Sequence, residues 1–352
     1  METSYLNNIL ETVGETPMIK LNRITQKIKA TVLAKVETFN PGGSVKDRIA
    51  ITIIEDAEKK GFLKPGGTIV ESTSGNTGSG LALIAALKGY KTVFTMPDKV
   101  SVEKIRRLEA FGAEVIVTPT TVPPDSPESY YSVAKKVATE TPNAILANQY
   151  FNPANPETHY QTTGPEIWTQ TGGKIDYFVA GIGTGGTITG VGKFLKEQKP
   201  DVKIIGADPL GSILKDYFYT RQMVPAHPYK VEGVGEDIIP GTLDFNYIDE
   251  VITVTDKESF CTARQITREE GIFVGGSSGM AAHAALKVAE NLPADRMVVV
   301  LFPDSGQNYL TTFYSDDWLK QNRCFDPEKG CLHTVLRKKN HHHLSSLKKE
   351  KK

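Results

Sequence analysis

The sequence has no excess of charge of either sign and no long apolar run. Its 41 Lys and Arg residues balance 41 Asp and Glu residues, so the broad basic surface of a nucleic-acid-binding protein is not expected. The longest apolar run, MVVVLF at residues 297–302, is far shorter than the about 20 residues that cross a bilayer as a helix. Residues 1–17 include acidic side chains and lack the apolar core of a secretion signal. These absences predict a cytoplasmic protein that binds neither nucleic acid nor a membrane.

Cysteine is also scarce. The 352 residues contain three cysteines, Cys261, Cys324 and Cys331, and an odd number in a chain of this length predicts reduced thiols. Cys324 and Cys331 lie near His333 and the histidines at residues 341–343, but their spacing matches no standard zinc site. No metal is therefore expected.

What the sequence does contain is a regular alternation of two patterns. Short runs rich in β-branched residues alternate with helix-length amphipathic stretches, several of which end at a glycine. The predicted strands are residues 31–37, 68–73, 91–97, 113–119, 144–148, 177–183, 203–209, 250–255 and 297–303. The clearest predicted helices are residues 44–61, 101–112, 128–140 and 257–271. This alternation predicts an α/β fold with mainly parallel sheets that helices cover on both faces.

So many strands would make a large open sheet, and an Asn- and Pro-rich segment at residues 149–159 is a suitable place to divide them. We therefore expect two lobes of mainly parallel sheet flanked by helices, with a cleft between them. Ligands of such sheets bind beyond the carboxyl ends of the strands, so the loops that leave strands are the candidate sites. Residues 320–352 lose the pattern and are rich in Lys and His, which predicts a flexible, solvated tail.

The first candidate loop is NPGGSVKDR, residues 40–48, which places a lysine at the start of a predicted helix. Gly42 and Gly43 allow a tight turn, and Ser44 is a candidate N-cap. Lys46 then lies in the first helical turn, where the helix dipole disfavours a cation. Its neutral amine is thereby favoured, as a lysine that forms a Schiff base requires. A solvated surface lysine is the simpler alternative.

The second loop is ESTSGNTGSG, residues 71–80, which follows a predicted strand and opens a helix near Asn76. Exposed backbone N–H groups and small hydroxyl side chains at a helix N-terminus form an anion site. A plain capping turn explains about half of these residues. It does not explain so many hydroxyl groups around Gly75.

The third loop is GIGTGGTITG, residues 181–190. It matches the pattern GxGxxG at Gly181, Gly183 and Gly186. Asp208 ends the next predicted strand 22 residues after the last of these glycines, so a dinucleotide site and an NAD-dependent oxidoreductase are one interpretation. Thr184 and Thr187 favour another, because hydroxyls mixed with backbone N–H groups suit a terminal phosphate monoester.

The fourth loop, at residues 273–290, is a Gly- and Ser-rich turn that enters a helix. Together, PGGSVKDR, TSGNTG, GTGGT and GGSSG resemble the cystathionine β-synthase and cysteine synthase family of fold-type II pyridoxal-phosphate enzymes, over about residues 8–320. The resemblance implies a tryptophan synthase β-like fold, pyridoxal 5'-phosphate as cofactor and a homodimer. It implies a large cofactor-binding lobe formed by residues 1–40 and 149–320. Residues 41–148 would form a smaller mobile lobe that closes over the substrate, and residues 321–352 a basic tail.

The resemblance also implies roles for single residues. Lys46 resembles the lysine that holds the cofactor as an internal aldimine and later takes the Cα proton. Asn76 corresponds to the partner of the cofactor's 3-hydroxyl, and Ser277 to the partner of its pyridine nitrogen. The implied phosphate cup is Gly183, Thr184, Gly185, Gly186 and Thr187. The implied substrate-binding residues are Thr73, Ser74, Gly75, Asn76, Thr77, Gln149, Tyr150, Gly233 and Glu236.

Five further stretches resemble cystathionine β-synthases more than O-acetylserine-using cysteine synthases. They are residues 124–134, 148–160, 208–216, 231–240 and 302–319. The expected reaction is therefore β-replacement through an aminoacrylate intermediate, which forms cystathionine from homocysteine plus serine, or from homocysteine plus cysteine with release of hydrogen sulfide. Cysteine synthesis from O-acetylserine and sulfide is the alternative, and a non-catalytic amino-acid-binding protein is a third.

Two features depart from the animal members of this family. Glu236 stands where eukaryotic synthases carry Tyr, which affects the choice of second substrate. The haem-binding extension and the paired regulatory domains have no counterpart among the motifs, so neither haem nor adenosylmethionine control is expected.

Overall fold

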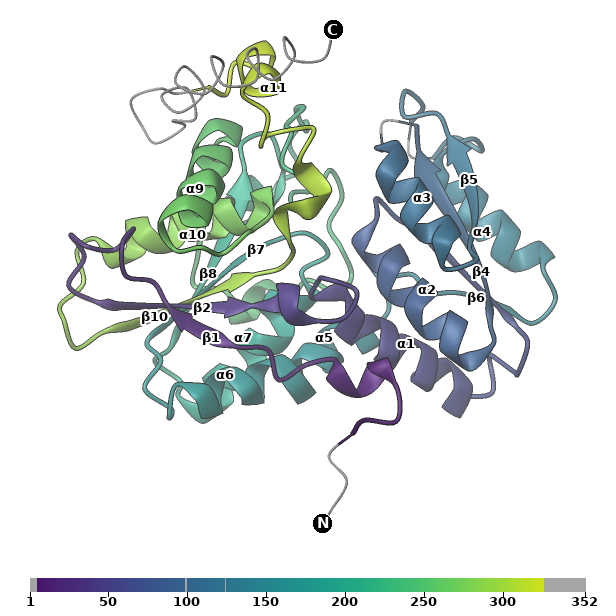
Figure 1. Ribbon diagram of the computed structural model, residues 1–352, viewed down its shortest axis with the longest axis horizontal. Coiled ribbons are helices and arrows are strands. Elements are labelled where there is room, and N and C mark those ends of the chain that lie inside the picture. The colour runs from purple at the N-terminus through teal and green to yellow at the C-terminus, as the bar shows by residue number, and fades with distance from the viewer. Residues whose placement is uncertain (1–4, 99, 124, 326–352) are drawn as a thin grey trace, which may run out of the picture.

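The computed structural model describes residues 5–98, 100–123 and 125–325, and these residues form two sheets with helices on both faces (Figure 1). The larger sheet has the strand order β1-β2-β10-β7-β8-β9. Its strands are β1 (Met18–Lys20), β2 (Thr31–Val36), β7 (Tyr177–Gly181), β8 (Lys203–Pro209), β9 (Glu250–Val254) and β10 (Met297–Phe302). All neighbours pair in parallel except β1 and β2, which are antiparallel.

The smaller sheet has the order β5-β4-β3-β6 and is entirely parallel. Its strands are β3 (Thr68–Ser72), β4 (Lys91–Pro97), β5 (Glu114–Thr118) and β6 (Ala144–Leu146). We refer to the parts of the chain around the two sheets as the large lobe and the small lobe. The predicted α/β class is confirmed by this architecture.

Helices follow most strands. Those before residue 150 are α1 (Lys46–Lys59), α2 (Asn76–Lys88), α3 (Val102–Ala110) and α4 (Tyr130–Glu140). Those after it are α5 (Ala154–Thr158), α6 (Gly164–Gln170), α7 (Gly186–Gln198), α8 (Leu214–Thr220), α9 (Asp256–Glu269), α10 (Gly276–Ala289) and α11 (Asp316–Gln321). The remaining helical turns are η1 (Ile9–Thr12), η2 (Glu37–Phe39), η3 (His159–Thr163), η4 (Phe245–Tyr247) and η5 (Gly306–Tyr309).

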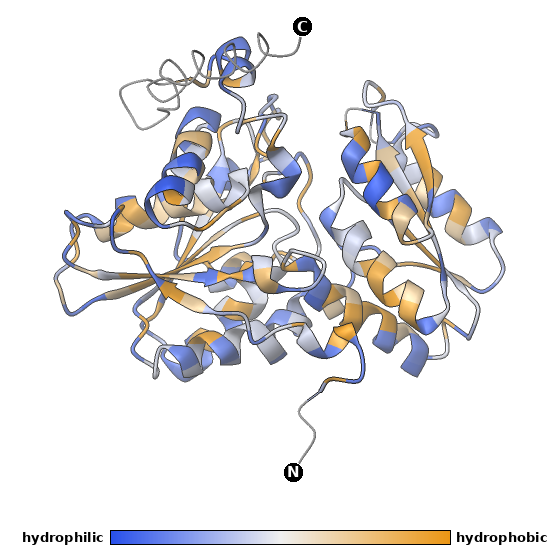
Figure 2. Cartoon of the chain, in the orientation of Figure 1, coloured by the Kyte–Doolittle hydropathy of each residue, from blue (hydrophilic) through white to orange (hydrophobic). Residues whose placement is uncertain are grey.

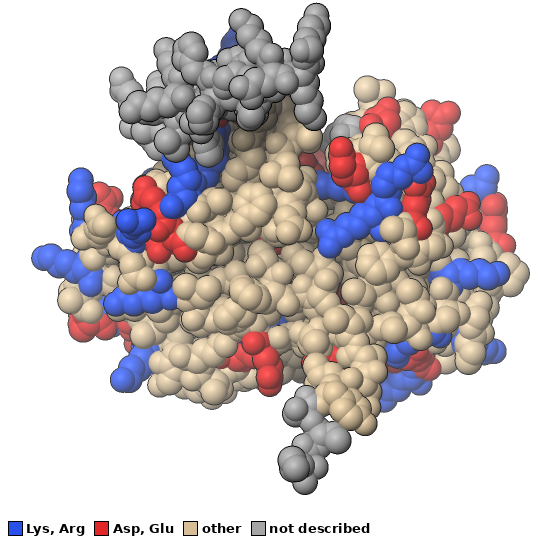
Figure 3. All heavy atoms as spheres, viewed as in Figure 1, with Lys and Arg blue, Asp and Glu red and all other residues tan. Residues whose placement is uncertain are grey.

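Apolar side chains bury the sheets on both faces. Figure 2 shows hydrophobic strands inside and helices with one hydrophobic and one hydrophilic side. Two buried clusters cover the faces of the large sheet, and a third joins α1 and α2 to the small sheet. Lys, Arg, Asp and Glu are interspersed over the face in Figure 3, in keeping with the balanced composition. Among the described residues, no helix has the length and apolar character needed to cross a membrane.

Three expectations need correction. Strand β1 was not predicted, because its three residues are too few to show a period. The N-cap of α1 is Val45 and not Ser44, although the Ser44 hydroxyl still accepts a bond from the Lys46 amide at 3.2 Å. Cys261 is disulfide-bonded, contrary to the expectation of reduced thiols, because pairing depends on contacts that composition does not show.

The predicted tail from residue 326, with Cys331 and His333, lies outside the described residues.

Candidate active site

The loop before α1 places Lys46 beside the carboxyl end of β10. The Val45 amide donates to the Pro303 carbonyl at 2.8 Å, and Ser44 forms an isolated bridge with Asp304. Gly43 has a φ of 81°, a left-handed conformation that favours glycine. Lys46 is the first residue of the helix, as the sequence predicted.

The Lys46 amine is partly shielded and has no hydrogen bond or ion pair with any residue that the structure describes. Burial lowers its pKa to about 8, against the opposing effect of the carboxylates of Glu236, Asp304 and Glu71. The helix dipole was expected to favour the neutral amine, whereas desolvation is the main cause of the lowered pKa. A lysine with this pKa has an appreciable neutral fraction near neutral pH.

The Asn76 loop turns sharply before α2. Gly75 has a φ of 143°, and a Cβ there would lie 3.3 Å from Lys104 Cδ. The Thr73 hydroxyl accepts from the backbone amides of Gly75 and Gly78 at 3.0 and 3.3 Å, so it shapes the loop. The Asn76 amide nitrogen donates to Asp304 Oδ2 at 2.9 Å.

Gln149 faces the same loop from the segment that joins the lobes. The Thr77 hydroxyl donates to Gln149 Oε1 at 2.7 Å. Glu71, at the end of β3, accepts from the backbone amides of Asn148 and Gln149 at 2.6 and 3.4 Å and so supports a turn in which Asn148 has a φ of 54°. Burial raises the Glu71 pKa to about 7, against the effect of these bonds. Sequence reasoning missed Glu71 as a support of this turn.

The predicted phosphate cup lies at the N-terminus of α7, where Gly185 has a φ of 82°. Asn155 donates to the Thr184 hydroxyl at 3.0 Å and to the Gln149 carbonyl at 2.8 Å, which links the cup to Gln149 and, through it, to the Asn76 loop. The backbone must pass close to Asn155, because a Cβ on Gly186 would lie 1.9 Å from its Oδ1.

A buried histidine stands behind the cup. The Thr187 hydroxyl lies 3.2 Å from His159 Nε2, and His159 Nδ1 lies 2.9 Å from the Thr163 hydroxyl. Burial, with smaller effects from Arg48 and Lys46, lowers the pKa of His159 well below its usual value, so this ring is neutral. The cup therefore offers helix N–H groups and hydroxyls to an anion without a nearby positive histidine.

Ser277 is the second residue of α10 and is 4% exposed. Within residues 5–325, apart from the two gaps at 99 and 124, no side chain or backbone group hydrogen-bonds its hydroxyl. A Cβ on Gly181 would lie 3.9 Å from the Ser277 carbonyl oxygen, so α10 starts beside the end of β7. The Ser277 hydroxyl is thus available to a ligand.

Glu236 is buried and does not lie among the solvated residues of its loop. It is 9% exposed, and burial raises its pKa to about 8, with Asp237 as the next cause. Tyr150 and Tyr131 stack edge to face with ring centroids 5.9 Å apart. Burial raises the pKa values of both tyrosines, and the charge of Glu236 adds to this effect. Glu232, in contrast, pairs with Lys104 of the small lobe, and the Gly233 carbonyl would lie 2.7 Å from a Cβ on Gly183.

Buried ion pairs fix the helix that carries Lys46. Arg48 donates from Nε to Glu37 at 2.7 Å and from Nη1 to Glu166 at 2.6 Å. Lys35 donates to the second oxygen of Glu166 at 2.5 Å. The bonds of Arg48 hold the first turns of α1 against η2 and α6, and Lys35 of β2 joins the same network through Glu166.

All four predicted loops therefore meet in one region. The first, second and fourth meet at Asp304, whose backbone carbonyl accepts from Gly275 at 3.0 Å. The second and third are joined through Gln149 and Asn155. Asp208, the residue that supported a dinucleotide site, instead accepts from the Lys215 amide at 2.9 Å and holds the start of α8.

A family model described as "Pyridoxal-phosphate dependent enzyme" matches residues 9–304. The chain belongs to this family. It is 51% identical over 327 residues to a protein of Apis mellifera named "Cystathionine beta-synthase", which covers 92% of this chain and 64% of that protein. The chain thus spans less than two thirds of the length of that relative.

Two solved structures share the fold. The O-acetylserine dependent cystathionine beta-synthase from Helicobacter pylori matches with a TM-score of 0.81 and 38% identity, over 88% of this chain and 99% of that one. A hydrogen sulfide-producing enzyme from Fusobacterium nucleatum matches with a TM-score of 0.81 and 35% identity, over 87% and 100%.

The residues present suit the family's cofactor. Lys46 offers an amine with a lowered pKa to an aldehyde, and the N-terminus of α7 offers N–H groups and hydroxyls to a phosphate. The Ser277 hydroxyl, without a partner among the described residues, suits a pyridine nitrogen. The described residues contain no cluster of His, Cys, Asp and Glu suited to a metal ion.

Proposed function

We propose that the chain catalyses a pyridoxal-phosphate-dependent β-replacement that forms cystathionine, from homocysteine and either serine or cysteine. The observation that carries this proposal is the Lys46 amine, which has a pKa lowered to about 8 and no partner among the described residues. It lies where the four loops converge. With cysteine as first substrate, the leaving group is hydrogen sulfide.

When bound, pyridoxal phosphate supplies an electron sink for the Cα carbanion of an amino acid. Lys46 would hold its carbonyl carbon covalently, and residues 183–187 would hold its phosphate. Once the substrate amine has displaced it, Lys46 takes the Cα proton as a general base, because its lowered pKa leaves part of it neutral.

The substrate carboxylate would bind at the N-terminus of α2. The Thr77 hydroxyl donates to Gln149 Oε1, and with the backbone amides of this turn it would form an anion site of the kind found at helix N-termini. Tyr150 lies beside Gln149 and in contact with Tyr131 of α4. Closure of the small lobe onto the large one would exclude water from the reacting carbon.

Ser277 directs the reaction toward β-replacement. A neutral hydroxyl at the pyridine nitrogen does not keep the ring protonated as a carboxylate would. The weaker electron sink favours loss of the β-substituent over transamination.

The second substrate would meet Glu236. Homocysteine carries an ammonium group, and sulfide does not, so a buried carboxyl in the cleft favours the amino thiol. The names of the relatives from Apis mellifera and Helicobacter pylori support the same product, and the Fusobacterium nucleatum enzyme supports hydrogen sulfide release.

Cysteine synthesis from O-acetylserine and sulfide is the second candidate. The observation that favours it is the use of O-acetylserine by a protein with the same fold. The Helicobacter pylori structure is described as O-acetylserine dependent, so this ester belongs in every assay. With sulfide it would give cysteine, and with homocysteine it would give cystathionine.

The test is a matrix of purified protein with serine, cysteine or O-acetylserine against homocysteine or sulfide, with products separated by chromatography. We expect cystathionine from homocysteine plus serine or cysteine, at a higher kcat/KM than cysteine from O-acetylserine and sulfide. Rapid cysteine formation without cystathionine from either pair would replace the proposal by the second candidate. A preparation with no visible cofactor absorption after incubation with pyridoxal phosphate would remove both.

Glu236→Ala tests the choice of second substrate. We expect a higher KM for homocysteine and a smaller change in the reaction of the first substrate. The matched control is Asp237→Asn, which changes the neighbouring exposed carboxylate. Equal homocysteine KM values in the two variants would contradict the role of Glu236.

A further inference from the structure

Asp304 is a buried carboxylate that the proposed mechanism does not use. It follows β10 and is 1% exposed. Its backbone pairs with Ser44 on one side and accepts from the Gly275 amide on the other. It therefore stands between the loop that carries Lys46 and the start of α10.

The side chain of Asp304 makes two short bonds through one oxygen. Oδ2 accepts from Asn76 Nδ2 at 2.9 Å and from the Tyr309 hydroxyl at 2.7 Å. Oδ1 has no partner among the residues that the structure describes. Oδ2 accepts both bonds and so carries no proton, which means that the NH₂ group of Asn76 has to face it and the amide oxygen has to face away. Asn308 agrees with this orientation, because its Nδ2 lies 3.5 Å from Asn76 Oδ1.

An amide nitrogen carries two hydrogens, and Asp304 takes one of them. The other has no acceptor among the described residues. A freely rotating asparagine presents its oxygen or its nitrogen to a ligand, and these have opposite hydrogen-bonding roles. The carboxylate removes this ambiguity.

We propose that Asp304 is a positioning residue that fixes the amide of Asn76 so that its second N–H donates to the 3-hydroxyl oxygen of the cofactor. Tyr309 holds the carboxylate in place. The proposal rests on the assignment of Asn76 to the cofactor, and it adds two residues that act through Asn76 without touching the ligand.

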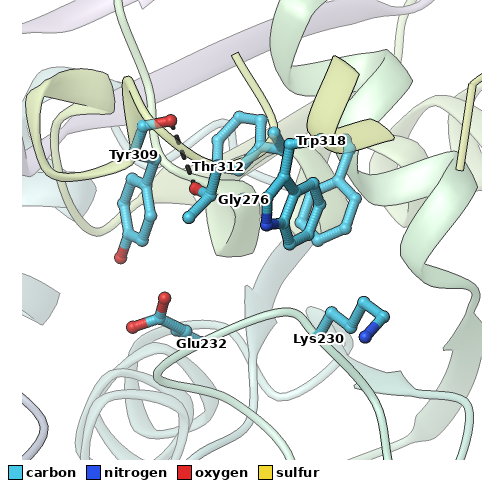
Figure 4. A pocket seen from close by; sticks show the side chains of 8 residues that line it. Lys230, Glu232, Gly276, Tyr309, Thr312 and Trp318 are labelled. Atoms are coloured by element: carbon cyan, nitrogen blue, oxygen red, sulfur yellow. Dashed lines mark hydrogen bonds between the residues drawn. The ribbon is translucent and has the colours of Figure 1, made fainter. Parts of the chain in front are cut away.

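The surrounding backbone is built around this carboxylate. A Cβ on Gly275 would lie 1.9 Å from Asp304 Oδ1 and 2.9 Å from the Tyr309 ring, so the residue before α10 has to be glycine. Figure 4 shows the Tyr309 ring at one side of a small pocket that Gly276 also lines, with Glu232 opposite the hydroxyl end of the ring. A buried carboxylate costs free energy unless it is well bonded, and two bonds to one oxygen orient it firmly.

The experiment is a double-mutant cycle on binding of pyridoxal phosphate, with Asp304→Ala, Asn76→Ala and the double variant. Cofactor dissociation constants come from titration of the apoprotein, and the absorption spectrum of the bound cofactor is the second readout. We expect Asp304→Ala to weaken binding by roughly tenfold, the size of one hydrogen bond to a charged group. We also expect it to shift intensity from the longer-wavelength band to the shorter one, because the 3-hydroxyl oxygen loses its donor.

The distinguishing result is the double variant. If Asp304 acts through Asn76, the double variant binds no more weakly than Asn76→Ala alone, since neighbouring residues in one network are not additive. Effects that multiply, or an unchanged spectrum in Asp304→Ala, would overturn the proposal. Asp176→Ala is the control, because Asp176 lies before β7 at the amino ends of the strands of the same sheet, where it pairs with Lys199 and Arg296. Its effect should multiply with that of Asn76→Ala.

If Asp304→Ala does not fold, Tyr309→Phe replaces it, because it removes one bond to Oδ2 and leaves the carboxylate. Tyr309→Phe should weaken cofactor binding less than Asn76→Ala does, and it should have no further effect when combined with Asn76→Ala. An effect of equal size in the native chain and in Asn76→Ala would overturn the proposal. If Asn76→Ala alone binds the cofactor normally, the premise is wrong and the proposal is overturned with it. None of these outcomes bears on the choice of substrates, because the substrates are identified from the reaction products and not from cofactor binding.

Discussion

The two ends of the candidate site differ in charge. Around the predicted phosphate cup the supporting side chains are uncharged, with Asn155 and a neutral His159 behind it. Around Lys46 three carboxylates are buried, those of Glu71, Glu236 and Asp304. A phosphate can be held by helix N–H groups and hydroxyls alone, whereas the lysine end contains groups whose protonation changes near neutral pH. The difference predicts that the cup governs retention of the cofactor and the lysine end governs the chemistry and its pH dependence.

Lys46→Ala breaks the lysine end completely and has the largest expected effect. It removes both the covalent attachment and the general base, and loss of a general base alone typically costs 10²–10⁴ in rate. Turnover should be lost, and borohydride reduction should no longer fix the cofactor to the protein. Turnover at the native rate in this variant would contradict the assignment of Lys46.

Ser277→Asp adds a charge where the structure has a neutral hydroxyl. The carboxylate would hold the pyridine ring protonated, so β-replacement should fall by at least about tenfold, a barrier increase of about 1.4 kcal/mol, and side reactions should gain share. Product ratios and kcat measure this. If Ser277 only caps α10, the substitution should change stability little and leave the product ratio unchanged, because Asp caps a helix about as well as Ser.

Thr187→Ala tests the uncharged end. One hydrogen bond to a charged phosphate contributes about 1.5–3 kcal/mol, so the variant should lose cofactor faster on dialysis while its fold is kept. Thr163→Ala, which removes the other partner of His159, is the control. If both variants retain the cofactor as the native protein does, Thr187 is not a phosphate ligand.

Glu236→Gln should have the smallest effect, on stability against pH. Burial raises the Glu236 pKa to about 8 in the folded protein, while an unfolded glutamate has a pKa of about 4.3. The folded state therefore binds more protons between these values, and the contribution of Glu236 to stability falls as pH rises through this window. Denaturation by urea at pH 5 and pH 8 should show a smaller decrease for the variant than for the native chain, and Glu290→Gln, at an exposed site, should match the native chain.

The motifs predicted the strand ends and helix starts well because they are local. All nine predicted strands form, and Lys46, Asn76 and Ser277 lie at the helix starts that the glycines and small residues indicated. β1 was missed because its three residues pair antiparallel with β2 through contacts that no local pattern records.

The residues behind the motifs could not be predicted in the same way. Glu71 and Asp304 act through partners 77 and 228 residues away, and the sequence gives only one usable signal for them: a carboxylate at the carboxyl end of a buried strand. Asn155 and His159 lie in a segment that looked like a linker and instead packs under α7. The burial of Glu236 could not be predicted either, because it depends on the path of the whole loop at residues 231–240.

The helix that carries Lys46 has a divided attachment. Its apolar face, with Ile49 and Ile53, belongs to the core of the small lobe, but Arg48 is tied by buried ion pairs to Glu37 and Glu166 of the large lobe. Breaking these pairs would leave buried charges without partners, at a cost of about 3–5 kcal/mol. If the small sheet shifts relative to the large one, these ion pairs would therefore keep Lys46 in place, so that opening the site would not require the lysine to move.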